Sequence, residues 1–198
     1  MADDARWAAR FPDLFAEQQI DYAGVTIRCT TAPPRDELVN RLHLVAVTND
    51  GSVVVCRSVE GWRFLPGGTR EPDESITELA RRELLEEAGA TALGPPRVFV
   101  SFRALSSRPE PYRPHLAHPE AIWAYGVSRV ELTDAPTCPP DGEEIVEVAT
   151  LPPAEAAAWL AEHDETHADV LRLAVAMGLV PKDPDRTVES GRSRTSFH

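Results

Sequence analysis

The sequence lacks several features that mark large classes of protein. No apolar run approaches the roughly 18 to 20 residues that span a bilayer, and the N-terminus lacks the basic and then apolar order of a secretory signal. Cysteines are few, and the 3 present are far apart with no CxxC pair. This favours reduced thiols over a disulfide framework or a metal site. We therefore expect a cytoplasmic protein with no membrane partner.

Positive charge is also scarce. The 198 residues include 32 acidic and 20 basic side chains, which gives a formal net charge of -12. Proteins that hold nucleic acids or anionic membranes by direct contact cluster lysine and arginine on one surface. The composition therefore argues against nucleic acid as a partner, and any phosphate group bound here needs a cation from another source.

The hydrophobic pattern predicts an α/β fold with one main core. Strand-like runs cover 25–29, 42–47, 53–56, 62–65, 98–102, 122–127 and 145–148. Helical patterns cover 6–17, where Pro12 interrupts, 75–88, 154–162 and 167–177. The expected organisation is an N-terminal extension over 1–37, a domain over 38–165, a C-terminal helix over 166–181 and a flexible tail over 182–198.

The most regular segment is the helix predicted over 75–88. Ser75 and Glu78 form the pattern of a capping box, and Gly89 fits the left-handed position after the last turn. Opposite its apolar stripe lie three acids, Glu83, Glu86 and Glu87. Like charges three or four residues apart cost a helix about 0.2 to 0.5 kcal/mol per pair. A solvated acidic face is the ordinary explanation, and a site for a hard divalent cation is the alternative.

The residues around this helix favour the cation site. Reading on from Gly68, five residues lead to Glu74, seven more to Arg82-Glu83-Leu84, one more to Glu86-Glu87 and one more to Gly89-Ala90. This spacing matches the Nudix box, G-x5-E-x7-R-E-U-x-E-E-x-G-U with U aliphatic, and only the small Ala90 is an unusual occupant. The chain thus resembles the Nudix (MutT-like) hydrolases, which implies an α/β/α sandwich with a mixed β-sheet.

The resemblance also implies an activity. It implies a hydrolase dependent on Mg²⁺, with Mn²⁺ as a substitute, that cleaves the pyrophosphate of a nucleoside diphosphate linked to another moiety. The partner is then a small nucleotide-like substrate, and a homodimer is compatible. The implied metal ligands are Gly68 through its carbonyl, Glu86, Glu87 and Glu83, the last of which either binds metal or orients water. Arg82 would hold a glutamate in place.

A general base is also needed, and the residues leave it open. The candidates are Glu83, Glu120, Glu143 and Glu144. We rank Glu144 slightly above Glu120, because it follows a turn and precedes a strand, where many relatives place a functional acid. The expected catalytic residues are therefore Glu83, Arg82 and Glu144.

Other features have two readings each. The proline-rich loop over 109–119 is either a lid on the substrate or a plain connection. The aromatic residues of the predicted strands stack on a base or belong to the core; they are Trp62, Phe64, Trp123 and Tyr125. His163 and His167 have a spacing compatible with zinc, but no supporting motif surrounds them.

Two other functions remain open. A Nudix-fold module could bind a nucleotide metabolite without cleaving it, although the intact acids of the box argue against this. Isopentenyl diphosphate isomerases share the fold, but Cys56 and Cys138 lack the context of their dedicated cysteine. No downstream signature assigns ADP-ribose, a dinucleoside polyphosphate or coenzyme A as the substrate.

Overall fold

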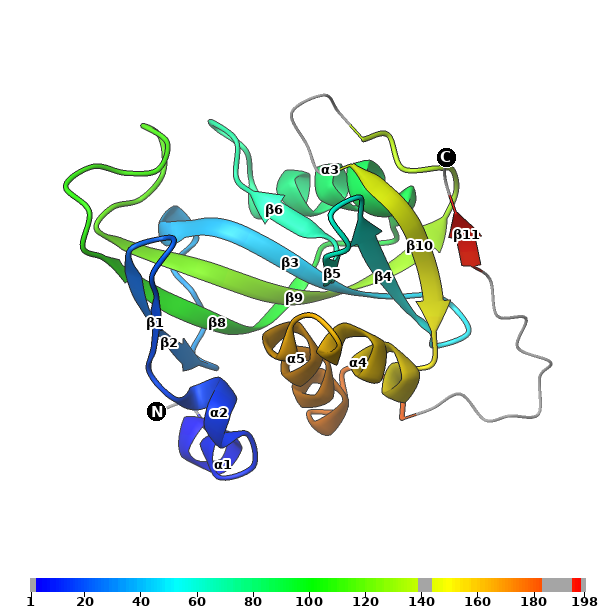
Figure 1. Ribbon diagram of the computed structural model, residues 1–198, viewed down its shortest axis with the longest axis horizontal. Coiled ribbons are helices and arrows are strands. Elements are labelled where there is room, and N and C mark those ends of the chain that lie inside the picture. Colours follow the sequence, from blue (N-terminus) through cyan, green and yellow to red (C-terminus); the bar gives the residue numbers. More distant parts are fainter. Residues whose placement is uncertain (1–2, 139–143, 183–193, 197–198) are drawn as a thin grey trace.

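A mixed β-sheet organises the chain, and helices cover both of its faces (Figure 1). The computed structural model describes residues 3–138, 144–182 and 194–196. The order of strands is β1-β2-β8-β9-β3-β4-β10-β11, with β5 beside β4, β6 beside β3 and β7 beside β9. The strands are β1 (Gln18–Ile20), β2 (Val25–Thr30), β3 (Val39–Val47), β4 (Val53–Ser58), β5 (Arg63–Phe64), β6 (Gly67–Thr69), β7 (Ala90–Ala92), β8 (Arg97–Ser106), β9 (Glu120–Leu132), β10 (Ile145–Leu151) and β11 (Arg194–Ser196). The predicted α/β fold is confirmed.

The helices form two layers around this sheet. They are α1 (Asp4–Ala8), α2 (Pro12–Phe15), a 3-10 turn η1 (Asp36–Leu38), α3 (Ile76–Ala88), α4 (Pro153–Ala161) and α5 (Glu165–Ala176). Helix α3 lies on one face, and α4 and α5 lie on the other, with α1 and α2 beside them (Figure 1). The helix predicted over 6–17 is two short helices, because Pro12 begins a new one.

Alternation along β3 explains why the sheet has two cores. Successive strand residues point to opposite faces. Leu42 and Leu44 are fully buried with the apolar stripe of α3, whereas Val45 and Val47 are buried with α4 and α5. Strand β3 runs parallel to β9 and antiparallel to β4, from which a short turn separates it. This central strand therefore fixes both helical layers.

Local signals set the limits of α3. The Ser75 hydroxyl accepts a hydrogen bond from the Glu78 backbone N–H, and the Glu78 carboxylate accepts one from the Ser75 N–H, so the predicted capping box is present. Gly89 ends the helix with a φ of 58°. A Cβ at this position would lie 2.1 Å from the Asp134 carbonyl oxygen, so the close approach requires glycine.

Strand β6 differs from the sequence-based expectation. We expected a strand over 62–65 to stop at Pro66-Gly67-Gly68, but Gly67–Thr69 forms its own strand, antiparallel to β3. The two glycines supply no side-chain pattern, so the strand depends on its partner. At the other end of the chain Arg194–Ser196 pairs with β10. The rest of the predicted tail, apart from Lys182, lies outside the described residues.

The N-terminal segment is joined to the sheet by polar contacts as well as apolar packing. Asp4 in α1 accepts hydrogen bonds from the Thr30 hydroxyl at 2.8 Å, the Thr31 N–H at 2.7 Å and the Thr31 hydroxyl at 2.6 Å. Trp7 and Leu14 are buried in the same core as the apolar residues of α4 and α5. In the part of the chain that the structure describes, no helix has the length and apolarity to cross a membrane.

The Asp4 contacts predict a pH-dependent contribution to stability. Partial burial raises the pKa of Asp4, but the hydrogen bonds from Thr31 and Thr30 outweigh it, so the pKa lies below its usual value. The contribution is therefore complete above the unfolded-state pKa, about 3.9, and is lost as the pH falls through the lower folded-state pKa. We expect Asp4→Asn to lower the free energy of unfolding by about 1 kcal/mol at pH 7.

Urea denaturation of both proteins at several pH values measures this difference. The difference should shrink as the pH falls below the range of Asp titration. Asp3→Asn is the matched control, because Asp3 forms only an exposed ion pair with Arg6 and should matter by less than about 0.5 kcal/mol. An Asp4 effect that stays constant down to pH 2 would contradict the explanation.

Candidate functional site

The carboxylates of α3 lie against the two glycines of β6. The Gly67 N–H donates a 2.7 Å hydrogen bond to the Glu87 carboxylate, which is buried. A Cβ on Gly68 would lie 2.4 Å from Glu83 Oε1, so the glycine leaves the space that this carboxylate occupies. The spacing of the box therefore brings the glycine backbone of β6 into contact with the acids of α3.

Arg82 joins the remaining acids into one network. Its Nε and NH2 donate to the two carboxylate oxygens of Glu74, at 2.8 and 3.0 Å. Its NH1 donates to Glu83 at 2.8 Å and to Glu86 at 3.1 Å, and NH2 also reaches the Thr69 carbonyl. Glu74, which the sequence marked only as a position of the box, thus fixes the orientation of Arg82 through two hydrogen bonds.

This network carries more negative than positive charge. Three carboxylates, those of Glu74, Glu83 and Glu86, surround one guanidinium, and a fourth, that of Glu87, lies on α3 against β6. Burial raises the pKa of Glu83 to about 7, although the adjacent Arg82 opposes the shift. Hydrogen bonds to Glu74 raise the pKa of Arg82, which stays charged. One arginine thus leaves a buried excess of negative charge, which a cation would stabilise.

The oxygen-rich site suits a hard cation, but its side chains do not enclose one. Within 3–138, 144–182 and 194–196, no group of three or more His, Cys, Asp or Glu side chains is arranged to hold a metal ion. The reason is visible in the network, because Arg82 NH1 lies between Glu83 and Glu86. Mg²⁺ commonly takes only one or two protein carboxylates, with water and substrate phosphate as its other ligands. The carboxylate oxygens of this site fit such an ion.

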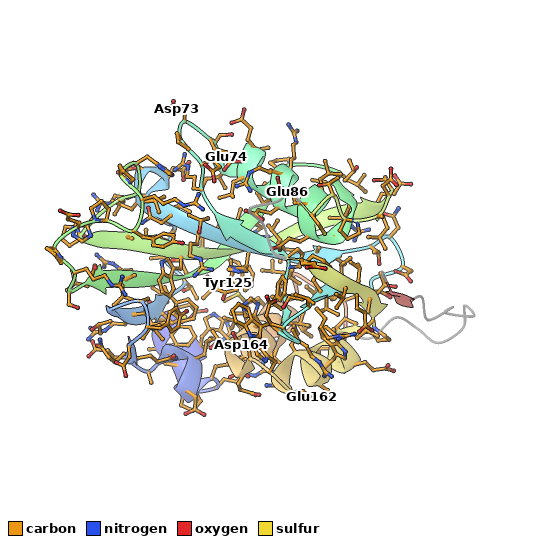
Figure 2. The ribbon with its side chains drawn as sticks, turned by 45° about the horizontal axis from the view of Figure 1, so that its top comes forward. Asp73, Glu74, Glu86, Tyr125, Glu162 and Asp164 are labelled. Carbon is orange, nitrogen blue, oxygen red and sulfur yellow. The ribbon has the colours of Figure 1, made fainter. Side chains whose placement is uncertain are left out.

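A cavity of about 1290 Å³ opens beside the network. It reaches from α3 across the sheet to α5, and Figure 2 shows Glu86 on the α3 side and Asp164 at the α5 side, with Tyr125 on the sheet. Every site residue predicted from the sequence contributes to its lining: Gly68, Arg82, Glu83, Glu86, Glu87 and Glu144. The structure therefore brings all the predicted site residues together.

The candidates for the general base separate into different places. Glu144 is exposed, lines the cavity, and its carbonyl accepts a hydrogen bond from the Val59 N–H. Glu120 is not in the lining; it pairs with Arg103 at 2.9 Å on the outer part of the sheet. Glu143 lies outside the described residues. Of these candidates, Glu83 and Glu144 thus line the cavity and Glu120 does not, and the choice of base stays a prediction.

The structure also places the aromatic residues and histidines for which the sequence left two roles open. Trp62, Phe64, Trp123 and Tyr125 all line the cavity. His163 and His167 line it too, but the buried His167 accepts a hydrogen bond from the Leu65 N–H, which gives it a structural role. The cysteines are absent from the lining, and the buried Cys56 thiol donates to the Glu87 carbonyl. A catalytic cysteine is therefore not supported.

The loop over 109–119 is anchored beside the acidic end of the cavity. Arg113 pairs with Glu71 at 2.6 Å, and a ring nitrogen of His115 lies 2.8 Å from the Arg70 carbonyl. Of this loop, only Arg113 reaches the lining. The loop is thus held in one place and borders the cavity.

Sequence reasoning missed one wall and part of the floor. Gln18, Ile20, Tyr22 and Ile27 form a wall from the N-terminal segment, and Arg41 and His43 lie on β3. The alternation of polar Arg41 and His43 with apolar Leu42 and Leu44 was a signal for a two-sided strand. For the N-terminal wall the sequence offered none, because long-range pairing of β2 with β8 places it.

A comparison with family models agrees with this geometry. The model described as NUDIX domain matches residues 40–174, more than half of the chain. The chain belongs to the Nudix family. The match includes the box and the sheet around it, while the wall formed by residues before 40 lies outside it.

One solved structure shares the fold of this Nudix chain, and others resemble it more weakly. A NUDIX hydrolase from Nitrosomonas europaea has a TM-score of 0.50 at 19% identity, over 77% of this chain and 97% of that one. The pyrophosphohydrolase BsRppH of Bacillus subtilis scores 0.48 at 16% identity, over 66% and 76%. The MutT protein of Methanosarcina mazei Go1 scores 0.48 at 17%, over 71% and 94%. A comparison with curated proteins gave no match.

The first glycine of the Nudix box has a direct test. Gly68→Ala places a Cβ 2.4 Å from Glu83 Oε1, which Arg82 and burial hold in place. We expect the free energy of unfolding to fall by about 1 to 3 kcal/mol, as for other overpacked positions. Gly94→Ala is the matched control, because a Cβ there meets nothing within 4 Å. Equal urea midpoints for the two variants would show that Gly68 has no steric role.

Proposed function

We propose that this Nudix protein is a Mg²⁺-dependent pyrophosphohydrolase that cleaves a nucleoside diphosphate linked to another moiety. The observation that carries the proposal is that three carboxylates of α3, those of Glu83, Glu86 and Glu87, line a large cavity together with Arg82, which bonds to the first two. Such a network is costly as a purely structural device, because it places like charges in a buried site. These carboxylates have a function if they hold a cation that binds the phosphate groups of a substrate.

Each residue of the box would have a distinct role in this reaction. A bound Mg²⁺ would neutralise charge on the pyrophosphate and activate water. Glu86 and Glu87 would hold the ion with the Gly68 carbonyl, and Glu83 would bind it or orient the attacking water. Arg82 would hold the carboxylates of Glu83 and Glu86 in place, since it already donates hydrogen bonds to both. Glu74 would keep Arg82 in place through two hydrogen bonds.

Glu144 would accept the proton of the attacking water. Its side chain is exposed to solvent in the cavity and its backbone is fixed on Val59, so the carboxylate can reach a substrate from the β4 side. Glu120 would have no such role, because two arginines, Arg35 and Arg103, hold it elsewhere.

The direct experiment is a phosphate-release screen of nucleoside triphosphates, ADP-ribose, nucleotide sugars, diadenosine polyphosphates and NADH with Mg²⁺ or Mn²⁺. We expect turnover of at least one of these compounds. Glu86→Gln and Glu87→Gln should each lower kcat/KM by about 100-fold or more, because each removes a carboxylate that would hold the ion against the reacting phosphates. Activity should also disappear with EDTA and return with excess Mg²⁺.

Glu78→Gln is the matched control on the same helix. Glu78 is exposed and belongs to the capping box, which glutamine also satisfies. Its activity should equal that of the parent. Tight binding of one of these compounds without turnover would replace the hydrolase with a nucleotide-binding module.

A second comparison tests the general base. Glu144→Gln should lower kcat by about 100-fold with little change in KM, because general-base catalysis contributes roughly 10²-fold to 10⁴-fold. Glu120→Gln should leave kcat unchanged, since Glu120 is outside the cavity lining. Steady-state kinetics on the best substrate measures both. If only Glu120→Gln slows turnover, the assignment of Glu144 is wrong.

A further inference from the structure

One arginine of the cavity differs from the other three that line it. The three with carboxylate partners are Arg63 with Glu162 at 2.6 Å, Arg82 with Glu74 at 2.8 Å and Arg113 with Glu71 at 2.6 Å. In the described part of the chain Arg41 has no ion pair or hydrogen bond from its guanidinium, and its Nε is buried without a partner. A buried donor left unpaired costs about 1 to 3 kcal/mol. A charged group of this kind suits an anion that arrives from outside.

The neighbours of Arg41 fix where this group lies. Its guanidinium carbon is 5.5 Å from the ring centre of Trp123, its partner across the parallel pair β3–β9. Two residues on, His43 stacks on Tyr125 with ring centres 5.3 Å apart. A guanidinium over an indole ring can still donate hydrogen bonds from its N–H groups. The floor of the cavity is thus aromatic, with one planar cation in it.

Tyr22 stands at the rim of the same cavity. It lines the cavity although it is 78% exposed. Arg41 and Tyr125 line the same cavity as Tyr22. An exposed aromatic ring beside an aromatic floor can receive a planar group without displacing any core contact.

The turn that carries Tyr22 is held in place. Arg108 donates a 2.6 Å hydrogen bond to the Tyr22 carbonyl, and Ser107 donates to the Gly24 carbonyl from its N–H and its hydroxyl, both at 3.0 Å. These bonds join the β1–β2 turn to the end of β8. A ring on a fixed turn loses less conformational freedom on binding than a ring on a free loop.

We propose that Arg41 and Tyr22 form a subsite for the nucleoside half of the substrate, in which Arg41 binds a phosphate oxygen and Tyr22 stacks on the base. The inference rests on the proposed function for its substrate class. It makes the preferred substrate a nucleotide derivative with a planar base and makes the segment before residue 40, which lies outside the family match, part of the binding site. The box then binds the phosphate chain at the other end of the cavity.

Binding of AMP without metal tests the subsite apart from catalysis. Titration calorimetry with the full chain in EDTA should show AMP binding more tightly than adenosine or ribose 5-phosphate. Arg41→Met should weaken AMP about tenfold and remove its advantage over adenosine, because it deletes a charge-assisted hydrogen bond. Tyr22→Leu should weaken AMP about tenfold and remove its advantage over ribose 5-phosphate, because base stacking on an aromatic ring is lost.

Matched controls are available for both changes. Tyr112 is also 78% exposed but lies outside the lining, and Arg28 is an exposed strand arginine outside it. Tyr112→Leu and Arg28→Met should bind AMP as the parent does. Arg41→Lys, which keeps the charge, should recover part of the lost affinity. Thermal denaturation of each variant separates loss of binding from loss of fold.

The outcomes distinguish the subsite from the proposed function. The subsite is overturned if the parent protein binds no AMP, if it binds ribose 5-phosphate as tightly as AMP, or if Arg41→Met and Tyr22→Leu bind like their controls. Metal-free AMP binding that needs both residues, in a protein that hydrolyses nothing, keeps the subsite and removes the hydrolase. Turnover that requires Glu86, with a KM that neither Arg41→Met nor Tyr22→Leu changes, keeps the hydrolase and overturns the subsite.

Discussion

The buried network around Arg82 is the constraint on which the rest of the structure depends. One guanidinium bonds to Glu74, Glu83 and Glu86, and the neighbouring Glu87 bonds to the backbone of β6. These contacts need glycine at 67 and 68, because a Cβ at either position would collide with β3 or with Glu83. They also need α3 to begin and end where its caps place it. The fold is thus organised to hold excess negative charge beside a cavity.

The two ends of that cavity have opposite character. The α3 end is acidic and suits a cation that shares phosphate ligands with the substrate. The sheet floor is aromatic, with Arg41 on Trp123 and His43 on Tyr125. An elongated substrate with phosphates at one end and a planar group at the other matches this arrangement. The net charge of -12 is thus compatible with phosphate chemistry, because under the proposed function the acids of α3 would hold the cation that meets the phosphates.

Local signals predicted much of the fold and the cluster of carboxylates on α3. The limits of α3, its capping box and Gly89 follow from residues within a few positions of one another. Strand β6 could not be predicted, because Gly67–Thr69 has no side-chain pattern and becomes a strand only by pairing with β3. Tyr22 and Arg41 were missed for a related reason. They meet in one cavity through the pairing of β2, β8, β9 and β3, which no local pattern encodes.

The most direct test of the account is an electron paramagnetic resonance titration of Mn²⁺ into the metal-free protein. The account predicts that the parent protein suppresses the signal of the free ion at near-stoichiometric Mn²⁺, and that the double variant Glu86→Gln, Glu87→Gln does not. A parent protein that leaves the free-ion signal as strong as the double variant does would contradict it, because the buried carboxylates would then have no cation to bind.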